Sequence, residues 1–295
     1  MKEYLSLNEY LKKTFGCKVY KIALDAGFTC PNRDGSVGRG GCVFCSGSGS
    51  GDFTFRGKSI EEQIEDGKRL LSKKADPSAS KYIAYFQAFT NTYAPAEKLE
   101  NIFMPVIIRD DIAALSIATR PDCLPADVLH LLEKLNRIKP VWVELGLQTS
   151  NEETAKYINR CYENRVYDKA VADLISIGLP QIITHVIIGL PGESKEDMLG
   201  TVRYVASSGS NGIKLQLLHV LKGTRLAQDY AKGLFKTLEM DEYLDIIKKC
   251  LKIIPPDMVV HRLTGDGAKK DLIAPLWSAD KKRVLNAMNF MKKKG

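Results

Sequence analysis

The 295-residue sequence lacks any apolar run of the length that a membrane-spanning helix needs. Its first segment, MKEYLSLNEYLKKTFG, carries too many charges for a secretory signal peptide. We therefore expect a soluble, cytoplasmic protein without a membrane partner. Because cytoplasmic thiols are kept reduced, its seven cysteines are not expected to form a disulfide framework.

Internal repeats and low-complexity segments are also missing, apart from the short run SGSGSG at 46–51. Hydrophobic residues make up 44% of the chain and charged residues 26%, which are ordinary values for a globular protein. The length suits one large domain or two small ones. The net charge of +8 permits a polyanionic partner such as nucleic acid, although the solvated surface lysines of a basic enzyme explain the same charge.

Three of the cysteines lie in one glycine-rich segment, CPNRDGSVGRGGCVFC, at 30–45. Cys42 and Cys45 form a C-x2-C pair, a spacing typical of zinc and iron–sulfur ligands, and Cys30 precedes them in the same segment. A closed zinc site takes four protein ligands, but no fourth cysteine of matching spacing follows, and no histidine is close in sequence. Three thiolates fit a [4Fe–4S] cluster with one iron open to an external ligand. A zinc site completed by a distant histidine is the alternative.

The other four cysteines are scattered along the chain, so we expect them to be small buried hydrophobes. They are Cys17, Cys123, Cys161 and Cys250. Their isolation argues against a second cluster.

Short β-rich runs alternate with amphipathic helical patterns through the chain. The predicted strands are 19–24, 82–87, 112–118, 141–148, 182–188 and 212–219, and 258–265 is a seventh candidate. This alternation predicts βαβ units with parallel pairing, and therefore an α/β fold, a partial (β/α)6 TIM-like barrel. We expect the barrel, with a cluster loop at 25–57, to occupy 1–225. An α/β extension at 226–295 is expected to pack on the barrel and to contribute to substrate binding.

Unusual polar segments follow the predicted strands. They are QAFTNTYAP, TRPD, GLPGES and HVLKGT, together with Glu144 and Gln148 in the fourth strand. Each segment alone has a structural explanation; GLPGE, for example, suits a turn and a helix start. Ligands of parallel α/β folds bind at the carboxyl ends of strands, so the joint placement of these segments favours a binding site.

Together these motifs resemble the radical S-adenosylmethionine (SAM) superfamily, in which three cysteines near the first strand hold a [4Fe–4S] cluster and SAM binds its open iron. Phe44 matches the aromatic residue that usually precedes the last cysteine. The usual C-x3-C-x2-C spacing is replaced by a longer loop, similar to that of the Elongator catalytic subunit. The motifs from ALDAGFTCPNRDGS to RLTGDGAKKDLIAPLW match the YhcC/YtqA group, whose YtqA-type members are also called MnmL, over nearly the whole chain.

The resemblance assigns site residues. Cys30, Cys42 and Cys45 are the implied cluster ligands. Arg120 is placed to pair with the SAM carboxylate, because a guanidinium binds a carboxylate bidentately. QAFTNT stands where the superfamily has a GGE segment, so backbone carbonyls would contact the SAM amino group with help from a side chain. The other implied cofactor contacts are Gln87, Asn91 or Thr92 for the amino group, Glu144 and Gln148 for the ribose, and Ile188, Gly189 and Leu190 for the adenine.

The resemblance also implies a reaction. A 5′-deoxyadenosyl radical, formed from SAM with an electron from an external reductant of the flavodoxin or ferredoxin type, abstracts hydrogen from a substrate. Members of the YtqA/MnmL group are implicated in tRNA wobble-uridine modification, converting a 5-carboxymethylaminomethyl side chain to 5-aminomethyl. Lysine-rich segments, including the terminal MKKKG, could contact tRNA phosphates. A radical SAM enzyme with a small-molecule substrate and a non-catalytic metal-binding RNA-interaction protein are the alternatives.

For the wobble-uridine substrate we expect hydrogen abstraction from the glycyl methylene, oxidation to an imine, and hydrolysis to glyoxylate and an amine. A cation should hold the glycine carboxylate; the candidates by position are Arg262, Lys222 and Lys269. Asp266, in TGDG, is a candidate for holding the amine or a water molecule, although such a sequence usually forms a turn.

Overall fold

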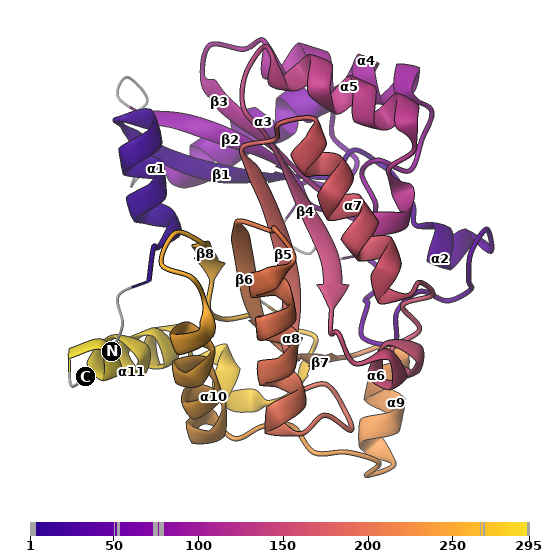
Figure 1. Cartoon of the computed structure of the whole chain (residues 1–295), viewed down its shortest axis with the longest axis vertical. Helices are drawn as coiled ribbons and strands as arrows, with labels where there is room; N and C mark the ends of the chain where they lie inside the picture. Colours follow the sequence, from indigo (N-terminus) through magenta and orange to yellow (C-terminus); the bar gives the residue numbers. More distant parts are fainter. Residues whose placement is uncertain are drawn as a thin grey trace.

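The computed structural model describes residues 4–49, 51, 54–72, 76, 80–265, 267 and 269–293. Within these residues, seven strands form one parallel sheet in the order β1-β2-β3-β4-β5-β6-β8, and the sheet curls into a half-barrel (Figure 1). The strands are β1 Lys18–Leu24, β2 Ser80–Phe86, β3 Ile112–Thr119, β4 Val141–Gln148, β5 Gln181–Ile188, β6 Gly212–Leu217 and β8 Val259–Arg262. The predicted α/β fold of the partial-barrel type is confirmed, including the seventh strand.

One predicted strand ends earlier than expected. The run 212–219 leaves the sheet after Leu217, and a two-residue strand, β7 Val220–Leu221, pairs antiparallel with β9 Leu272–Ala274. This antiparallel pairing connects the segment after β6 to the C-terminal part of the chain.

Helices cover the outer face of the sheet, as Figure 1 shows for α7 and α8. The helices are α1 Leu7–Phe15, α2 Pro31–Asp34, α3 Ile60–Leu71, α4 Ala96–Ile107, α5 Ala126–Asn136, α6 Glu152–Tyr157, α7 Asn164–Ser176, α8 Lys195–Ser207, α9 Arg225–Ala231, α10 Met240–Ile253 and α11 Lys281–Lys293. Two 3-10 turns are η1 Pro121–Cys123 and η2 Leu276–Ala279. The start of α8 follows the sequence signal, because the Ser194 hydroxyl accepts from the Asp197 amide in a capping box.

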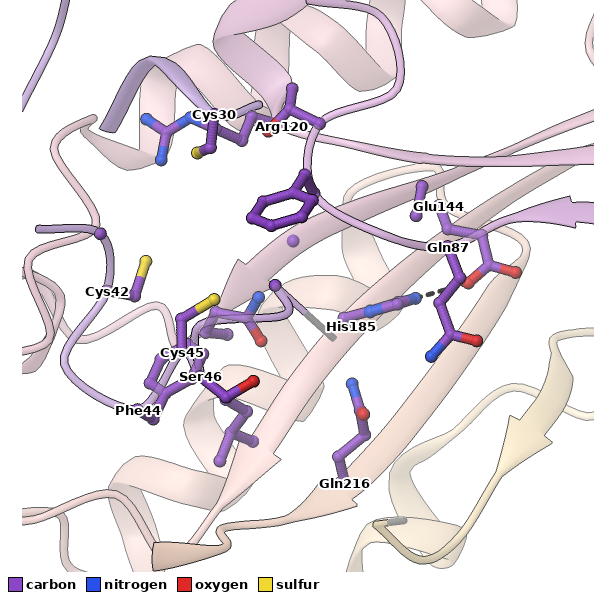
Figure 2. Close-up of a pocket in the computed structure, with 18 of the residues that line it drawn as sticks. Cys30, Cys42, Phe44, Cys45, Ser46, Gln87, Arg120, Glu144, His185 and Gln216 are labelled. Carbon is purple, nitrogen blue, oxygen red and sulfur yellow. Dashed lines mark hydrogen bonds and ion pairs between the residues drawn. The ribbon is translucent and has the colours of Figure 1, made fainter. Parts of the chain in front are cut away.

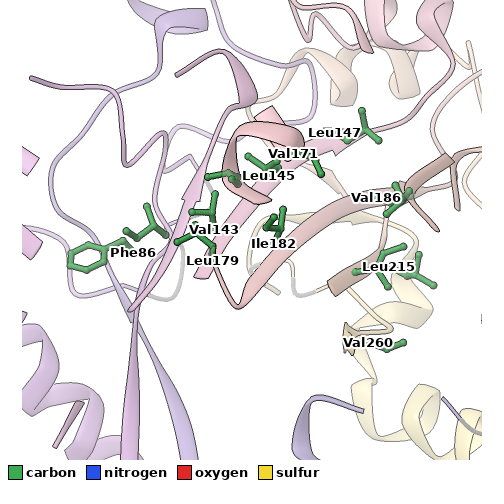
Figure 3. Packing of buried hydrophobic residues seen from close by; sticks show 14 of the residues in the cluster. Phe86, Val143, Leu145, Leu147, Val171, Leu179, Ile182, Val186, Leu215 and Val260 are labelled. Carbon is green, nitrogen blue, oxygen red and sulfur yellow. The ribbon is translucent and has the colours of Figure 1, made fainter. Parts of the chain in front are cut away.

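Alternation along β4 separates the core from the barrel interior. Val143, Leu145 and Leu147 are fully buried and belong to the main hydrophobic core with Val171 of α7 (Figure 3). Successive side chains of a strand point to opposite faces, so Glu144 and Gln148 face the interior of the half-barrel. One face of β4 therefore packs in the hydrophobic core, and its other face carries the polar side chains of Glu144 and Gln148.

Helix α1 closes the amino end of the half-barrel. Leu11 of this helix belongs to a small apolar cluster with Ile83, Trp142 and Ile183, whose side chains come from three strands. Tyr10 packs edge-on against Trp142 with ring centroids 5.9 Å apart. Apolar packing therefore fills the amino end of the half-barrel in the described part of the chain.

The segment 226–295 adds β8 to the same sheet, and its helix α10 lies beside α8 (Figure 1). Tyr243 and Ile247 of α10 share the main core with Val202 of α8. The predicted boundary at residue 225 stays a prediction. No helix in the described part of the chain is long and apolar enough to cross a membrane.

Candidate active site

The cysteine loop lies at the carboxyl ends of the strands. Cys30 follows β1 and immediately precedes α2, and the Cys45 amide donates to the Cys42 carbonyl at 2.9 Å. Figure 2 shows the sulfur atoms of Cys30, Cys42 and Cys45 around a common space. Buried Asn32 holds the loop in place, since its Nδ2 donates to the Asn159 carbonyl at 2.5 Å.

Glycines give this loop its shape. Gly40 and Gly41 both have φ near +78°, in the left-handed region that other residues rarely adopt. A Cβ on Gly38 would lie 2.2 Å from the side-chain oxygen of Asn32. The glycines that the sequence places between the cysteines are therefore required by conformation or by space.

The surroundings of the three thiols fit a cationic metal group. Burial, together with the neighbouring Cys45 and Cys30, raises the pKa of Cys42 to about 12 against the opposing effect of Arg120. Three ligand thiolates at this place therefore need a compensating positive charge, which an iron–sulfur cluster supplies. Among the described residues, no group of three or more His, Cys, Asp or Glu side chains is arranged to hold a single metal ion.

One cavity of about 240 Å³ extends from the cysteines into the half-barrel. Its wall includes alternate residues of neighbouring strands, such as Tyr85 and Gln87 from β2, His185 and Ile187 from β5, and Lys214 and Gln216 from β6. The residues predicted from the sequence that it brings together are Cys30, Cys42, Phe44, Cys45, Gln87, Arg120, Glu144, Gln148 and Arg262 (Figure 2). Their roles toward a cofactor remain predictions.

Asn91 and Thr92 do not line this cavity in the described structure. The Asn91 amide donates to the carbonyls of Phe86, Ala88 and Ala118 at 3.1, 3.1 and 2.9 Å. The Thr92 hydroxyl donates to the Cys123 carbonyl at 2.5 Å. Both side chains hold the segment after β2 against the end of β3, and the expected contact of one of them with SAM stays a prediction.

Ile188, Gly189 and Leu190 also lie outside the cavity wall. Ile188 belongs to the main core, on the opposite face of β5 from Ile187, and Leu190 is buried in a second apolar cluster. Ile187 lines the cavity instead. Successive side chains of a strand alternate between faces, so Ile187 and Ile188 point to opposite sides of β5. The expected backbone and apolar contact of Ile188, Gly189 and Leu190 with the adenine stays a prediction.

Gln148, at the end of β4, has a feature that points to a ligand. Its backbone has φ +69°, and its Oε1 is buried without a hydrogen-bond partner in the described structure. Gly146 leaves room for this side chain, since a Cβ there would lie 2.8 Å from the Gln148 Nε2. A buried acceptor without a donor is unfavourable, and a hydroxyl donor such as that of a ribose would satisfy it.

Arg120 is already held by an acidic partner. Its Nε and Nη2 donate to the two carboxylate oxygens of Asp122 at 2.8 and 2.6 Å, and its guanidinium lies 5.0 Å from the Tyr162 ring centroid. Burial opposes the charged form, but Asp122 outweighs it and raises the pKa of Arg120 above its ordinary value. A guanidinium has five N–H donors, so Arg120 retains donors for a cofactor carboxylate.

Glu144 is the centre of a buried polar cluster that the sequence analysis did not identify. Its Oε1 accepts from Lys21 Nζ at 2.8 Å and from the Ser116 hydroxyl at 2.7 Å. Its Oε2 accepts from His185 Nε2 at 2.6 Å (Figure 2) and from Lys214 Nζ. A carboxylate offers about four acceptor positions, and these four contacts use them. The expected ribose contact of Glu144 stays a prediction.

The protonation states of the cluster follow from burial and charge. Burial alone would raise the pKa of Glu144, but Lys21 and Lys214 outweigh it, so the pKa lies well below its ordinary value. Burial lowers the pKa of Lys214 to about 7, with Lys21 and Arg262 acting in the same direction and Glu144 opposing. Burial and Lys214 lower the pKa of His185 to about 4, so His185 is neutral at pH 7.

Two residues in the sequence indicated the buried polar cluster around Glu144. Lys21 and Lys214 are single charged residues inside otherwise apolar strands, VYKIAL and GIKLQLLH. A charged residue in a buried strand needs a partner, because an unpaired buried charge is costly. Only the sheet order shows that Glu144 is the shared partner.

Of the three cations predicted to bind the substrate, one lines the cavity and two do not. Arg262, the last residue of β8, lines the cavity. Lys222 and Lys269 are exposed and do not line it, and Lys222 Nζ donates to the Lys270 carbonyl at 3.2 Å. Asp266 lies outside the described residues.

Comparison with known proteins identifies the family. Residues 30–205 match the model of the radical SAM superfamily, and residues 210–293 match the radical SAM C-terminal domain. The chain belongs to the radical SAM superfamily. The Bacillus subtilis (strain 168) protein YtqA is 48% identical over 289 residues, which cover 98% of this chain and 89% of YtqA. The Escherichia coli (strain K12) protein YhcC is 37% identical over 268 residues, which cover 90% and 85% of the two chains.

The solved structure of Elp3 from the archaeon Methanocaldococcus infernus, with an N-terminal deletion, has the same fold. The TM-score is 0.69 at 19% identity, and the match covers 94% of this radical SAM chain and 64% of the Elp3 chain. The resemblance to the YhcC/YtqA group and to Elongator is thus confirmed. Radical SAM enzymes use a [4Fe–4S] cluster and SAM, which fits the three partly buried cysteines of the loop and the unpaired acceptor of Gln148.

Proposed function

We propose that this radical SAM enzyme modifies the wobble uridine of tRNA, converting a 5-carboxymethylaminomethyl side chain to 5-aminomethyl. The observation that carries the proposal is that Cys30, Cys42, Cys45, Gln148 and Arg262 line one cavity. Cofactor ligands and a cation for an acidic substrate group therefore open onto the same space.

When bound, the cluster and SAM supply a 5′-deoxyadenosyl radical, which takes a hydrogen atom from a substrate carbon. Cys30, Cys42 and Cys45 hold the iron, Arg120 the carboxylate of SAM, and Gln148 a ribose hydroxyl. Trp142 and α1 pack together at the amino end of the half-barrel, which limits the access of water from that end. Exclusion of water protects a reactive species from side reactions.

The proposed reaction is an oxidative cleavage of the carbon–nitrogen bond of the glycyl group. The glycyl methylene loses a hydrogen atom to the radical. The resulting carbon radical loses one electron to the oxidised form of an external flavodoxin-type or ferredoxin-type protein, and its nitrogen loses one proton, which gives an imine. Water adds to the imine carbon, and the carbon–nitrogen bond breaks with transfer of a proton to nitrogen. The products are glyoxylate and the 5-aminomethyl side chain. An external flavodoxin-type or ferredoxin-type protein is the proposed electron donor.

Charge and an aromatic ring at the cavity support a tRNA substrate. Phe89 lines the cavity, and the guanidinium groups of Arg33 and Arg56 lie 5.3 and 6.0 Å from its ring centroid. Aromatic rings and guanidinium planes are the groups on which splayed-out bases stack. The net charge is +8. A more distant relative, 22% identical over 204 residues, is the tRNA-2-methylthio-N(6)-dimethylallyladenosine synthase of Fusobacterium nucleatum subsp. nucleatum.

The test is turnover by the anaerobically reconstituted enzyme with SAM, a reductant, and tRNA that carries the 5-carboxymethylaminomethyl nucleoside. We expect loss of this nucleoside and appearance of the 5-aminomethyl nucleoside and glyoxylate, measured by mass spectrometry. Undermodified tRNA without the glycyl group is the matched control and should remain unchanged. SAM cleavage with no change in any tRNA nucleoside would contradict the tRNA proposal and would favour a small-molecule substrate.

A further inference from the structure

Asn32, shortly after Cys30 in the sequence, lies behind the cysteine loop. Its side chain is fully buried and does not line the cavity. Its Nδ2 lies 3.7 Å from the Cys42 sulfur and donates to it. Cys42 itself lines the cavity (Figure 2). The donor therefore approaches this sulfur from the protein interior, and the cavity side of the sulfur remains for iron.

Three further contacts fix the orientation of the Asn32 amide. Its Nδ2 also donates to the Asn159 carbonyl at 2.5 Å. Its Oδ1 accepts from the Cys161 thiol at 3.2 Å and from Asn159 Nδ2 at 3.5 Å. Exchange of the amide nitrogen and oxygen would bring two oxygens together at the Asn159 carbonyl and would take the acceptor away from the thiol. The nitrogen of the amide, and not its oxygen, therefore faces Cys42.

The segment that supports Asn32 has an unusual backbone conformation. Asn159 and Cys161 have φ of +56° and +62°, in the left-handed region, and Cys161 is exposed, contrary to the burial expected for an isolated cysteine. Asn159 Nδ2 donates to the Gly41 carbonyl at 2.8 Å, and the Gly41 amide donates to the Asn32 carbonyl at 2.8 Å. Such backbone conformations persist where the surrounding contacts fix them. The segment and the loop therefore hold the Asn32 side chain in one place.

We propose that Asn32 is a positioning residue that raises the reduction potential of the cluster through its N–H to the Cys42 sulfur. Hydrogen bonds to the sulfurs are one of the factors that set the potential of an iron–sulfur cluster. Reduction makes the ligand sulfurs more negative, and an N–H donor stabilises the more negative state more strongly. The donor therefore makes the cluster easier to reduce. This role of Asn32 is independent of the substrate, so an enzyme that is inactive on tRNA would contradict the proposed function alone.

The test is the midpoint potential of the cluster in the reconstituted full chain, measured by redox titration of the visible absorbance band. Asn32→Leu keeps a branched side chain but has no N–H. At a fixed ambient potential, the ratio of reduced to oxidised cluster should fall about threefold to tenfold in this variant, and a tenfold change corresponds to about 59 mV for one electron. Iron content is measured for each protein, so that potentials are compared between loaded clusters. A residue that only supported the loop would change iron content and not this potential.

Asn32→Ala is the second variant, because the space around Asn32 is narrow: a Cβ on Gly38 would lie 2.2 Å from the Asn32 Oδ1. Its small side chain keeps the test valid if Leu does not fit there, and the same fall in potential is expected. Asn101→Leu, an exposed change on α4, is the matched control and should leave the potential unchanged. A wild-type potential in either loaded Asn32 variant, or an equal fall in Asn101→Leu, would overturn the proposal. Failure of both Asn32 variants to load iron would also overturn it, because Asn32 would then be a structural residue of the loop.

Discussion

Glu144 and Lys214 form a buried ion pair across the half-barrel, although their strands β4 and β6 are separated by β5. His185 of the intervening β5 donates to the same carboxylate oxygen. Three consecutive strands of the sheet are thereby connected by side chains as well as by backbone hydrogen bonds. Glu144 and Lys214 therefore stabilise the barrel and also line its cavity.

Removing the charge of Glu144 should therefore destabilise the fold. Glu144→Gln leaves Lys21 and Lys214 buried without a carboxylate, and such a change costs about 3 kcal/mol. Thermal unfolding of the holoenzyme should show a clearly lower Tm. Glu133→Gln is the matched control, because Glu133 pairs with Arg137 on the exposed side of α5 and surface pairs contribute under about 1 kcal/mol. Equal Tm shifts for both variants would refute the central role of Glu144.

Cys→Ala variants should distinguish the ligands of the iron–sulfur cluster from the other cysteines. Reconstituted wild-type protein should contain about four irons per chain. Cys30→Ala, Cys42→Ala and Cys45→Ala should each abolish iron loading, whereas Cys123→Ala and Cys250→Ala should retain it, because both residues are buried outside the loop. Iron analysis and the visible absorbance band are the measurements. Stoichiometric zinc without iron would be incompatible with the assignment.

Gln148 should contribute to SAM affinity. Gln148→Leu removes the buried acceptor without changing the size of the side chain greatly, and loss of one hydrogen bond should weaken SAM binding about fivefold to tenfold. Gln228→Leu, on the exposed side of α9, is the control. Equilibrium binding of SAM to the anaerobic cluster-loaded protein decides the matter, and an unchanged affinity would exclude the ribose contact.

His185 should make the fold sensitive to acid. Its pKa in the folded protein is about 4, below the ordinary value of 6.5, because of burial and Lys214. The unfolded chain therefore binds a proton between pH 6.5 and 4 that the folded chain does not, and stability falls as the pH falls through this window. The loss is on the order of 3 kcal/mol.

Denaturant unfolding at pH 7.5 and pH 5 measures this effect. His185→Gln keeps a donor for Glu144 but does not titrate, so the difference in unfolding free energy between the two pH values should be smaller in the variant. His130→Gln is the control, because His130 is exposed on α5. The same pH dependence in wild type and His185→Gln would show that other groups cause it.

Binding of tRNA should depend steeply on salt, because each neutralised phosphate releases counterions. The terminal lysines Lys292, Lys293 and Lys294 were predicted to contribute; Lys294 and the side chains of Lys292 and Lys293 lie outside the described structure. Deleting 292–295 should reduce the slope of log affinity against log salt by about two to three. SAM cleavage without RNA should hardly change. A salt titration of tRNA binding measures the slope for both proteins, and a SAM-cleavage assay without RNA measures the second effect. A slope near zero for the full chain would leave the net charge without a role in RNA binding.

Local patterns in the sequence were sufficient to predict the strands and helices and the position of the cysteine loop. The seven strands follow from apolar runs separated by helical patterns, since hydrophobic periodicity is a local property. The spacing of Cys30, Cys42 and Cys45 and the glycines between them likewise depend on a continuous stretch of chain. The motifs at the ends of the strands predicted which face of the barrel carries the site.

The tertiary structure alone decided which side chains meet. Ile187 rather than Ile188 faces the cavity, and Asn91 and Thr92 are occupied by backbone carbonyls, because strand ends and loop paths are set by packing and not by local preference. Glu144 contacts Lys21, His185 and Lys214, and it lies 123 positions from Lys21 and 70 from Lys214 in the sequence. Their meeting depends on the order and curl of the strands, and Coulomb interactions become strong only after folding removes these groups from water.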